Sequence, residues 1–403
     1  MKIIHVVAGF SIDFPGGITN YVRTLAASQA GNGHDVIVLD GGESNRSHEL
    51  GFSVLGYSGN IRPFVLSCKE DREGTSQLKE MLLGEFPDLI HFHLTVGFGE
   101  DFYEDFAAAG QKYVVSMHDY YLLCPRITMM NWEGKNCGGP ERKKCETCVG
   151  KLDQVDLLYK AARRVHLPLP RIPSKAVTAR NAKVRSFLRG AEVVLPVSDR
   201  VRQLSAGPYP ELDYEVAHIG NVSASVDRPQ KTDSPNLRLT FIGVLSEHKG
   251  ADLLVKLAKG VTRKDVEFHF FGRAEGRWAV AAEKAGIIVH GSYTPADLPR
   301  IMASTDLGVV LPIWEDNGPQ VVMEFINYGV PVLATRMGGI PDFVSGDNGF
   351  LFDASAISDA IAYVDAAETE ALRSVGRSLP RLTSPGEHQE HMLRVYERAL
   401  LPA

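Results

Sequence analysis

The chain has 403 residues, 44% of them hydrophobic and 23% charged, a composition typical of a globular protein large enough for two domains. Its net charge of −6 argues against a nucleic-acid-binding protein. No apolar run approaches the roughly 20 residues of a membrane-spanning helix, and the polar His5 and Asp13 interrupt what could otherwise be a signal peptide. We therefore expect a cytoplasmic protein in a reducing compartment, without disulfides.

Short apolar runs alternate with longer mixed segments along the whole chain. Such runs, bounded by glycine or polar residues, are typical of strands buried on both faces of a parallel sheet. They lie at 3–7, 36–39, 89–93, 114–117 and 193–197, and again at 239–242, 266–271, 287–289, 307–311 and 332–334. With helices between them, they predict an α/β protein with two parallel sheets. Residues 221–235, rich in Ser, Asp and Pro, are the predicted linker.

The segment from Trp314 to Asp342 carries the strongest functional signal. Asp316 and Glu324 stand eight positions apart. Between them, Asn317 or Gly318 can cap a helix, and Pro319 suits its first turn. The unpaired N–H groups of such a start form an anion site suited to a diphosphate. Glu324 could accept both hydroxyls of a ribose, and Asp316 could accept from hydroxyls of a second ring. This layout indicates a nucleotide-activated sugar, although a surface Asp and Glu on an ordinary helix would show the same pair.

This segment resembles the signature of family 4 glycosyltransferases of the GT-B fold, in which two acids bracket seven residues before a G-x-P-V strand. The first acid is usually Glu and is Asp316 here. Further stretches are similar to the family: the Gly-rich loop Gly16–Ile18, the strand Pro87–His93, the strand end Leu195–Asp199, and Phe241–Gly243 with Lys249–Gly250.

The resemblance implies a GT-B fold, an α/β architecture of two doubly wound Rossmann-like domains facing a central cleft. We expect an N-terminal acceptor-binding domain over 1–220, with a Cys-rich insertion at about 120–150. A nucleotide-sugar-binding domain is expected over 236–385. Residues 386–403 should form a helix that crosses back to the first domain, with Leu393, Tyr396 and Leu400 on one face.

Donor-binding residues follow from both arguments. Lys249 is the best candidate to stabilise charge on the departing phosphate, in a loop that opens at Gly243. The family usually has an Arg where this chain has Val244, so Arg273 was considered as a replacement. A solvated loop lysine is the plainer alternative for Lys249. The donor-binding set predicted from the sequence is Gly16, Gly17, Gly243, Arg273, Gly318, Pro319, Gln320 and Glu324.

Catalytic roles are predicted for His118, Lys249 and Asp316. His118 ends a strand and precedes Asp119, and in the family the His of this pair contacts the donor sugar. A hydrogen-bonded core histidine is the alternative, with His91 and His93 expected to be structural. For the pair Gly16 and Gly17 the alternative is a plain turn. The resemblance implies retention of anomeric configuration, with the leaving phosphate as base, so no catalytic metal is expected.

Four of the five cysteines lie in one window, at Cys124, Cys137, Cys145 and Cys148. The spacing of the last two is that of a zinc knuckle, and four thiolates could close a tetrahedral structural zinc site. Free thiols and disulfides are the alternatives. The sequence from His118 to Arg126 is similar to a motif of one subgroup of the family, whose insertion carries these cysteines.

Residues 160–190 are basic and contain no acid, with the apolar loop Leu167–Pro173 in the middle. The basic residues are Lys160, Arg163, Arg164, Arg171, Lys175, Arg180, Lys183, Arg185 and Arg189. This stretch could rest on anionic lipid at the inner face of a membrane or bind a lipid pyrophosphate, or it could form ordinary solvated helix faces.

The sequence therefore predicts a retaining hexosyltransferase that uses a UDP- or GDP-sugar. The expected acceptor is a lipid-linked glycan of a surface polysaccharide such as O-antigen or exopolysaccharide. Alternatives are the same fold acting on a small-molecule acceptor, an epimerase, or a non-catalytic GT-B scaffold. A dinucleotide-dependent dehydrogenase is disfavoured because no G-x-G-x-x-G follows the first strand of either domain.

Overall fold

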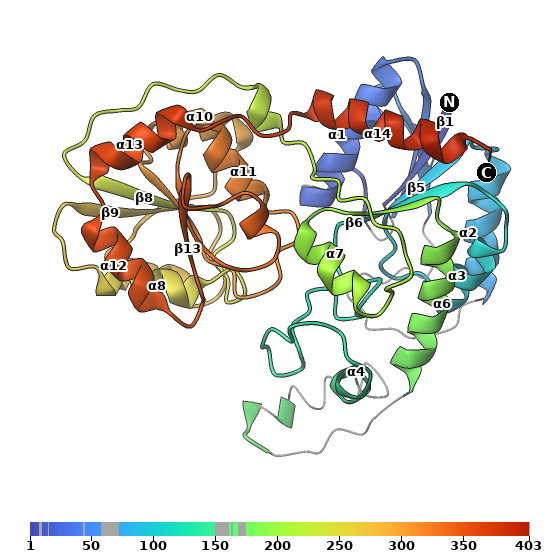
Figure 1. Ribbon diagram of the computed structural model, residues 1–403, viewed down its shortest axis with the longest axis horizontal. Coiled ribbons are helices and arrows are strands. Elements are labelled where there is room, and N and C mark those ends of the chain that lie inside the picture. The colour runs from blue at the N-terminus through green and yellow to red at the C-terminus, as the bar shows by residue number, and fades with distance from the viewer. Residues whose placement is uncertain are drawn as a thin grey trace. The chain divides into compact units, whose positions relative to one another are not determined.

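The chain forms two compact units (Figure 1). The structure, a computed structural model, describes every residue except 8–9, 15, 43–44, 58–71, 150–160, 163, 168–174 and 403. Unit 1 comprises Met1–Ile219 and Gly386–Ala403, and unit 2 comprises Gly220–Pro385. None of the helices in the described part of the chain has the length and apolar character needed to span a bilayer.

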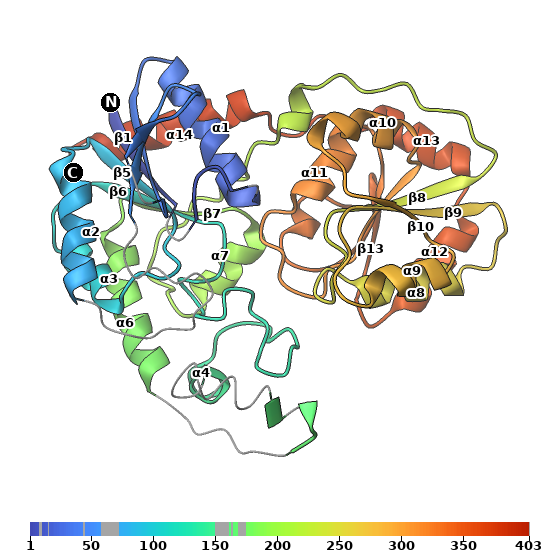
Figure 2. The same cartoon turned by 180° about the vertical axis from the view of Figure 1, so that it is seen from behind.

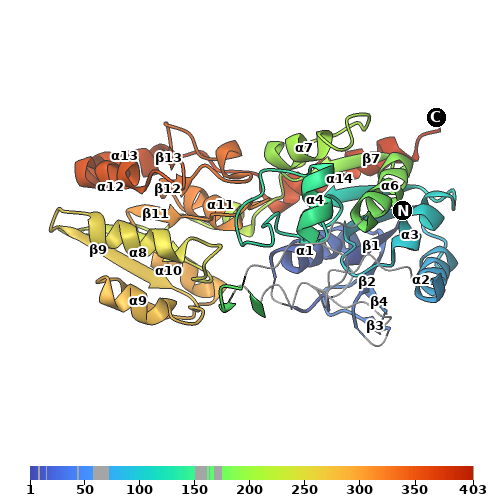
Figure 3. The same cartoon turned by 90° about the horizontal axis from the view of Figure 1, so that it is seen from below.

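Unit 1 is built on a seven-stranded sheet in the order β3-β4-β2-β1-β5-β6-β7. Figure 3 shows β2, β4 and β3 following β1 toward one edge, where β3 alone is antiparallel to its neighbour. The strands are β1 (Lys2–Val7), β2 (Asp35–Asp40), β3 (Arg46–Ser47), β4 (Ser53–Gly56), β5 (Leu89–Leu94), β6 (Tyr113–Met117) and β7 (Val193–Pro196). The helices are α1 (Gly17–Gly31), α2 (Arg72–Gly84), α3 (Glu100–Ala107), α4 (Arg142–Val149), α6 (Ala176–Gly190), α7 (Asp199–Ala206) and α14 (Pro385–Leu400).

Strand β5 shows how the sequence directs side chains to the two faces of this sheet. Successive residues of a strand point to opposite faces. Phe92 packs against Phe102 of α3 and Phe187 of α6. Its neighbours His91 and His93 point the other way, where His91 Nδ1 lies 2.6 Å from the hydroxyl of Tyr396 on α14. One face is therefore an aromatic core, and the other carries buried polar groups.

Helix α14 follows unit 2 in sequence but packs on unit 1, beside α1 (Figure 1). The hydroxyl of Tyr21 on α1 lies 2.7 Å from His388 Nε2, and Lys112 donates to the carbonyl of Ala399 at 2.7 Å. The buried apolar side chains of α14 are Met392, Val395, Tyr396 and Ala399. The predicted inward face was therefore wrong for Leu393 and Leu400, because the helix is rotated toward Met392.

Unit 2 has a six-stranded parallel sheet in the order β10-β9-β8-β11-β12-β13. Its strands are β8 (Leu237–Ile242), β9 (Val266–Phe271), β10 (Ile288–Gly291), β11 (Leu307–Val310), β12 (Val332–Thr335) and β13 (Gly349–Phe352). Its helices are α8 (Ala251–Gly260), α9 (Trp278–Lys284), α10 (Leu298–Ala303), α11 (Gln320–Asn327), α12 (Ile357–Ala366) and α13 (Thr369–Ser378), with short 3₁₀ turns at Val222–Ser225, Pro295–Asp297 and Ile340–Asp342. One core packs α8, α9 and α12 on the sheet, and a second packs α10 and α11 (Figure 2).

Residues 221–235, the predicted linker, group with unit 2. Arg228 donates to the carbonyl of Asn327 at 2.9 Å, and Lys231 donates to the carbonyl of Thr305 at 2.6 Å. Polar and proline-rich composition here reflects side chains that satisfy backbone carbonyls at the ends of α10 and α11. All ten predicted strands overlap observed ones, and the α/β prediction with two parallel sheets is confirmed.

Candidate functional site

In unit 2, Lys249 and Asp316 form an ion pair. Lys249 Nζ lies 2.8 Å from Asp316 Oδ2 and 4.9 Å from the centre of the Trp314 ring. Lys249 precedes α8, and Asp316 lies in the loop between β11 and α11. Because the strands are parallel, β8 and β11 end at the same edge of the sheet, which brings the two loops together. The structure thus brings together two predicted site residues that are 67 positions apart in the sequence.

Two glycines allow these loops to pack closely. Gly250 has φ of +86°, and a Cβ added there would lie 1.8 Å from the carbonyl oxygen of Leu311. Gly338 has φ of +55°, and its added Cβ would lie 2.0 Å from the carbonyl oxygen of Asp316. The amide of Gly339 also donates to that oxygen at 2.7 Å. The loop that carries Asp316 is therefore held by backbone contacts that no residue with a side chain could make.

Glu324 lies on α11 and is partly exposed, with one of its two carboxylate oxygens buried. This oxygen, Oε2, has no hydrogen-bond partner among the described residues. Burial raises the pKa of Glu324 to about 7. A buried carboxylate oxygen without a donor is costly, so its position requires an explanation.

Two further residues with unpartnered polar atoms, Trp314 and Asn317, lie in the loop between β11 and α11. Trp314 Nε1 and both side-chain atoms of Asn317 are buried without a hydrogen-bond partner in the described part of the chain. Sequence reasoning treated Asn317 only as a helix cap and missed this feature. With Glu324 Oε2, these are buried donors and acceptors that the described chain leaves unpaired.

The helix start differs slightly from the prediction. Pro319 is the N-cap, and α11 begins at Gln320, one residue later than expected. Neither Asn317 nor Gly318 caps the helix with a side chain. Gln320 Oε1 accepts a hydrogen bond from Asn221 at 2.6 Å, so this side chain already has a protein partner.

Arg273, the predicted replacement for the missing arginine, forms its ion pair away from Lys249. The Arg273 side chain is 74% exposed, and its ion pair is with Glu275 at 4.0 Å. Val244 is itself partly exposed. Gly243 directly follows β8, and its amide donates to the carbonyl of Phe271. Lys249 is therefore the one predicted cation that the structure places beside Asp316.

In unit 1, Gly16 and Gly17 begin α1 just after β1. Gly16 is the N-cap, and nothing lies within 4 Å of a Cβ added at Gly17. The amide of Gly16 is bonded to Thr19 Oγ1 at 3.1 Å, a local capping contact. The pair thus has a structural role in starting α1, and its predicted role in donor binding stays a prediction.

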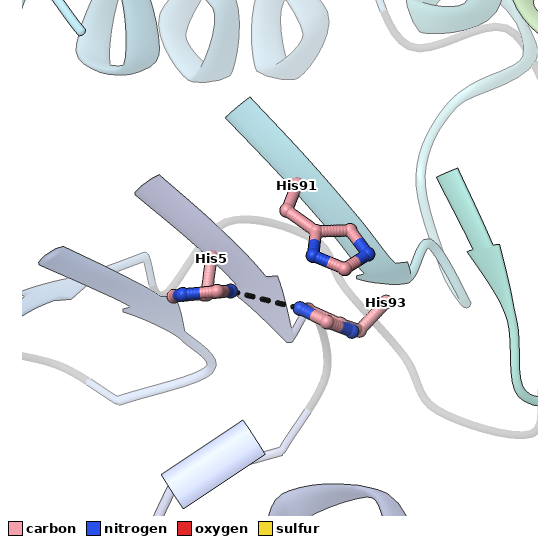
Figure 4. A group of neighbouring side chains, drawn as sticks. All are labelled: His5, His91 and His93. Atoms are coloured by element: carbon pink, nitrogen blue, oxygen red, sulfur yellow. Dashed lines mark hydrogen bonds between the residues drawn. The ribbon is translucent and has the colours of Figure 1, made fainter. Parts of the chain in front are cut away.

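His118 follows β6 and belongs to a group of four imidazoles, which we call the histidine cluster: His5, His91, His93 and His118. His118 Nε2 lies 3.1 Å from His93 Nδ1, and its ring centre lies 4.8 Å from that of Tyr21. Figure 4 shows His5, His91 and His93 meeting from neighbouring strands, because β1 and β5 pair in register at His5 and His91. The H-x-H spacing on β5 is a signal that could have predicted this cluster; nothing in the sequence pointed to its partner Gln29 on α1.

The four cysteines of the insertion line one cavity together with Met129 and Val177, among other residues. All four are free thiols, and burial raises the pKa of Cys124 to about 12. Among the described residues, only His5, His91 and His93 bring three metal-ligating atoms within 4.8 Å of one another. The sulfurs are therefore not at the separations of about 3.8 Å that a tetrahedral zinc site requires, and the described geometry does not fit the predicted zinc.

Three cations of the basic stretch are engaged within unit 1, whereas Arg164, Lys175 and Arg189 are exposed. Arg180 is fully buried and donates to the carbonyl of Tyr121 at 2.6 Å. Lys183 pairs with Asp101 at 3.4 Å, and Arg185 pairs with Glu211 at 2.7 Å. These cations therefore serve the packing of α6. Lys160, Arg163, Arg171 and most of the Leu167–Pro173 loop lie outside the described residues.

Comparison with known families identifies the chain. A model described as Glycosyltransferase Family 4 matches residues 15–218, which is half of the chain. The chain belongs to glycosyltransferase family 4. A second model, described as Glycosyl transferases group 1, matches residues 236–366. The first match covers the sheet of unit 1 except β1, and the second covers the whole sheet of unit 2.

Solved structures support the same fold for this family 4 chain. It superposes on sucrose-phosphate synthase from Thermosynechococcus elongatus with a TM-score of 0.65 at 13% identity, covering 98% of each chain. It superposes on Anabaena HepE in complex with UDP with a TM-score of 0.60 at 16% identity, covering 98% of this chain and all of that one. The GT-B fold predicted from the sequence is thus confirmed.

Curated relatives are more distant. The chain is 22% identical over 213 residues to WcaL of Escherichia coli, a protein proposed to be a colanic acid biosynthesis glycosyltransferase. It is 25% identical over 130 residues to an uncharacterised protein of the cps region of Klebsiella pneumoniae. The matched stretches span only 52% and 36% of these relatives.

Proposed function

We propose that this chain is a glycosyltransferase that moves a hexose from a nucleoside-diphosphate sugar to an acceptor, with retention of anomeric configuration. The observation that carries the proposal is Glu324, whose buried Oε2 has no partner in the described chain. The 2′- and 3′-hydroxyls of a ribose are donors that would satisfy it. Family membership and the Lys249–Asp316 pair in the same unit support this assignment.

Lys249 is the proposed phosphate ligand. Breaking the bond between the anomeric carbon and the phosphate oxygen leaves negative charge on the diphosphate. A preorganised ammonium near that oxygen stabilises this charge more in the transition state than in the ground state. The acceptor hydroxyl then attacks from the leaving-group side, and its proton passes to the departing phosphate. Asp316 and His118 are proposed to hold sugar hydroxyls, which positions the reacting carbon.

The test is binding of a panel of UDP- and GDP-sugars to the wild-type protein and to Glu324→Gln by calorimetry. Loss of a charged acceptor should weaken binding of the preferred donor by about 1.5–3 kcal/mol. The carboxylate form of Glu324 is the acceptor, and its pKa is raised to about 7. Wild-type affinity should therefore fall as pH decreases through 7, whereas the affinity of the variant should stay nearly constant.

Glu283→Gln is the matched control, because Glu283 is an exposed glutamate on α9 of the same unit. Its donor affinity and pH profile should equal those of the wild type. Equal donor binding by wild type and Glu324→Gln at pH 8 would remove Glu324 from the site. Slow release of nucleoside diphosphate from the bound donor, measured without acceptor, separates an enzyme from a non-catalytic scaffold.

The acceptor is proposed to be a lipid-linked glycan of a surface polysaccharide. The similarity to WcaL supports this class. Arg180, Lys183 and Arg185 are engaged within unit 1, so a membrane surface would have to use the exposed Arg164, Lys175 and Arg189 of the described part. Transfer of radiolabelled sugar to membrane lipid extracts, compared with transfer to free oligosaccharides, tests the acceptor class.

A structural zinc ion in the insertion stays a separate prediction. It is supported by the shared cavity of the four cysteines, whereas their described positions are too far apart for coordination. Elemental analysis of protein purified without chelator should find about one zinc per chain if the sulfurs close on a metal. Absence of zinc, together with four thiols that titrate in the native protein, would show that these cysteines are packing residues.

A further inference from the structure

A chain of hydrogen-bonding contacts runs through the histidine cluster from α1 to His118. His5 Nε2 lies 2.7 Å from Gln29 Oε1, and His5 Nδ1 lies 2.9 Å from His93 Nε2. The last contact, between His93 Nδ1 and His118 Nε2, is 3.1 Å long. Gln29 and His5 are completely buried, and His93 is nearly so. We call Gln29, His5, His93 and His118 the imidazole relay.

Every imidazole of the relay is neutral near pH 7. Burial lowers the pKa of His5 to about 4 and that of His118 to about 3. The pKa of His93 is held well below its usual value by burial and then by the neighbouring imidazoles. A neutral imidazole has one N–H donor and one bare nitrogen acceptor.

A line of neutral imidazoles can point in only one of two directions. If Nε2 of His5 carries the proton, its Nδ1 is bare, so His93 must donate to it from Nε2. The Nδ1 of His93 is then bare, and His118 must donate from its own Nε2. The group at the buried end therefore decides the tautomer at the other end. Gln29 presents its carbonyl oxygen to His5, and an oxygen can only accept.

The Gln29 amide meets the relay through its oxygen, because Oε1 lies 2.7 Å from His5 Nε2, whereas its buried Nε2 has no hydrogen-bond partner among the described residues. Tyr396, His91 and Ser116 form a separate set of contacts beside the relay. The Tyr396 hydroxyl lies 2.6 Å from His91 Nδ1, and His91 Nε2 lies 2.8 Å from Ser116 Oγ.

These contacts also weigh against a metal ion between His5, His91 and His93 (Figure 4). All six ring nitrogens of the three residues already have a hydrogen-bonding partner. A metal would need three bare nitrogens directed to one point, and it would have to break contacts in a fully buried group. Hydrogen bonding alone accounts for the arrangement.

The exposed end of the relay is where it can act. His118 is partly exposed. Its Nδ1 has no hydrogen-bond partner among the described residues, and this atom is not one of the fully buried unpaired atoms. We propose that Gln29 is a positioning residue that, through His5 and His93, holds His118 protonated at Nε2, so that its Nδ1 offers a lone pair to a substrate hydroxyl. A carboxylate or carbonyl at that point would meet a lone pair and be rejected.

Nitrogen NMR of histidine-labelled protein without any ligand tests the tautomer directly. The two-bond ¹⁵N–¹H pattern distinguishes Nε2–H from Nδ1–H, and His118→Gln identifies the His118 signal. We expect His5, His93 and His118 all to be protonated at Nε2 in the wild type. An Nδ1–H pattern for His118, or opposite tautomers at His5 and His93, would overturn the proposal whatever the function of the protein.

Variants separate this role from simple packing. Gln29→Met removes the acceptor of His5, and His5→Phe removes the connection between Gln29 and His93, while both keep about the same buried volume. In either variant the His118 pattern should change to that of two exchanging tautomers. Ser116→Ala removes an equally buried partner of His91, outside the relay, and should leave the His118 pattern unchanged. A His118 pattern that changes equally in all three variants, or in none, contradicts the proposal. If a variant fails to fold, the wild-type pattern still decides.

A ligand arm, which rests on the proposed function, follows for the preferred donor. Each sugar hydroxyl is replaced in turn by hydrogen or by fluorine, which accepts but cannot donate. At the hydroxyl that contacts His118, the hydrogen and the fluorine analogue should bind the wild type equally weakly. In His118→Ala, neither replacement should lower the affinity below that of the unmodified donor. Retained affinity with fluorine alone would mean that His118 donates. Failure of the protein to bind any nucleotide sugar would refute the proposed function and leave the tautomer result standing.

Discussion

At the scale of single residues, the Lys249–Asp316 pair fixes the position of the ammonium that we propose as the phosphate ligand. Both side chains are partly exposed, and ion pairs of this kind contribute little to stability. The pair therefore matters more for placing the ammonium than for holding the fold. A donor phosphate would replace Asp316 as the partner of Lys249, which leaves that carboxylate free to accept from sugar hydroxyls.

We predict that Lys249→Ala lowers turnover by about 10²–10³-fold, the usual effect of losing one charge partner of the transition state. Donor affinity should fall less, because the interaction is strongest with the departing phosphate. Steady-state kinetics measure both quantities. Lys256→Ala is the control, since Lys256 is an exposed lysine on α8 paired only with Asp252 at 2.6 Å. Near-normal turnover in Lys249→Ala would exclude the proposed phosphate contact.

At the scale of elements, the loop between β11 and α11 depends on the loop after β12. Gly338 lies against the backbone of Asp316, where no Cβ fits. Gly338 and Gly339 thus support the loop that carries Asp316 through backbone contacts. Such close backbone packing fixes the position of Asp316 before any ligand arrives.

Gly338→Ala should therefore destabilise unit 2 by about 1–3 kcal/mol, because the residue must keep a positive φ and the added carbon overlaps Asp316. Donor binding should weaken as well. Gly346→Ala is the control, since an added Cβ there meets nothing within 4 Å. Thermal unfolding monitored by calorimetry distinguishes the two. Equal midpoints for the two variants would show that the loops can separate without cost.

The elements also show what the sequence could and could not predict. Apolar runs located ten strands because burial on both faces demands continuous hydrophobic residues. They missed β3, which has only two residues, and β4 and β13, which are four residues long and end or begin with glycine. The acid pair predicted Lys249, Asp316 and Glu324 as candidates, yet the unpartnered atoms of Asn317 and Trp314 depend on packing that only the structure shows. Gln29 carried no local signal, since its partner His5 lies 24 residues away.

At the scale of the whole molecule, the path of the chain is the main finding. The return of α14 to the histidine face of unit 1 places Tyr396 on His91 and His388 on Tyr21. The resemblance predicted that a C-terminal helix crosses back. It did not predict that the helix covers the polar face of the sheet, which follows from the alternation of His and Phe on β5.

Met392 tests this docking. Its side chain is fully buried, so Met392→Ala should destabilise unit 1 by about 2–5 kcal/mol. Leu393→Ala, at the neighbouring position that the sequence had assigned to the inward face, should cost less than about 1 kcal/mol because Leu393 is only partly covered. Unfolding of unit 1, followed by hydrogen exchange of β1 and β5 amides, reports each effect. The reverse order would mean that α14 docks by its other face.

The course of this chain also sets an order of events during its synthesis. A ribosome completes all of unit 2 before it begins residues 386–400, whereas unit 1 stays unfinished until they emerge. During that interval His91 lacks Tyr396, whereas the partner of His5, Gln29 on α1, has already been made. Docking of α14 is thus the step that gives His91 Nδ1 its hydrogen-bonding partner and completes this face of the sheet.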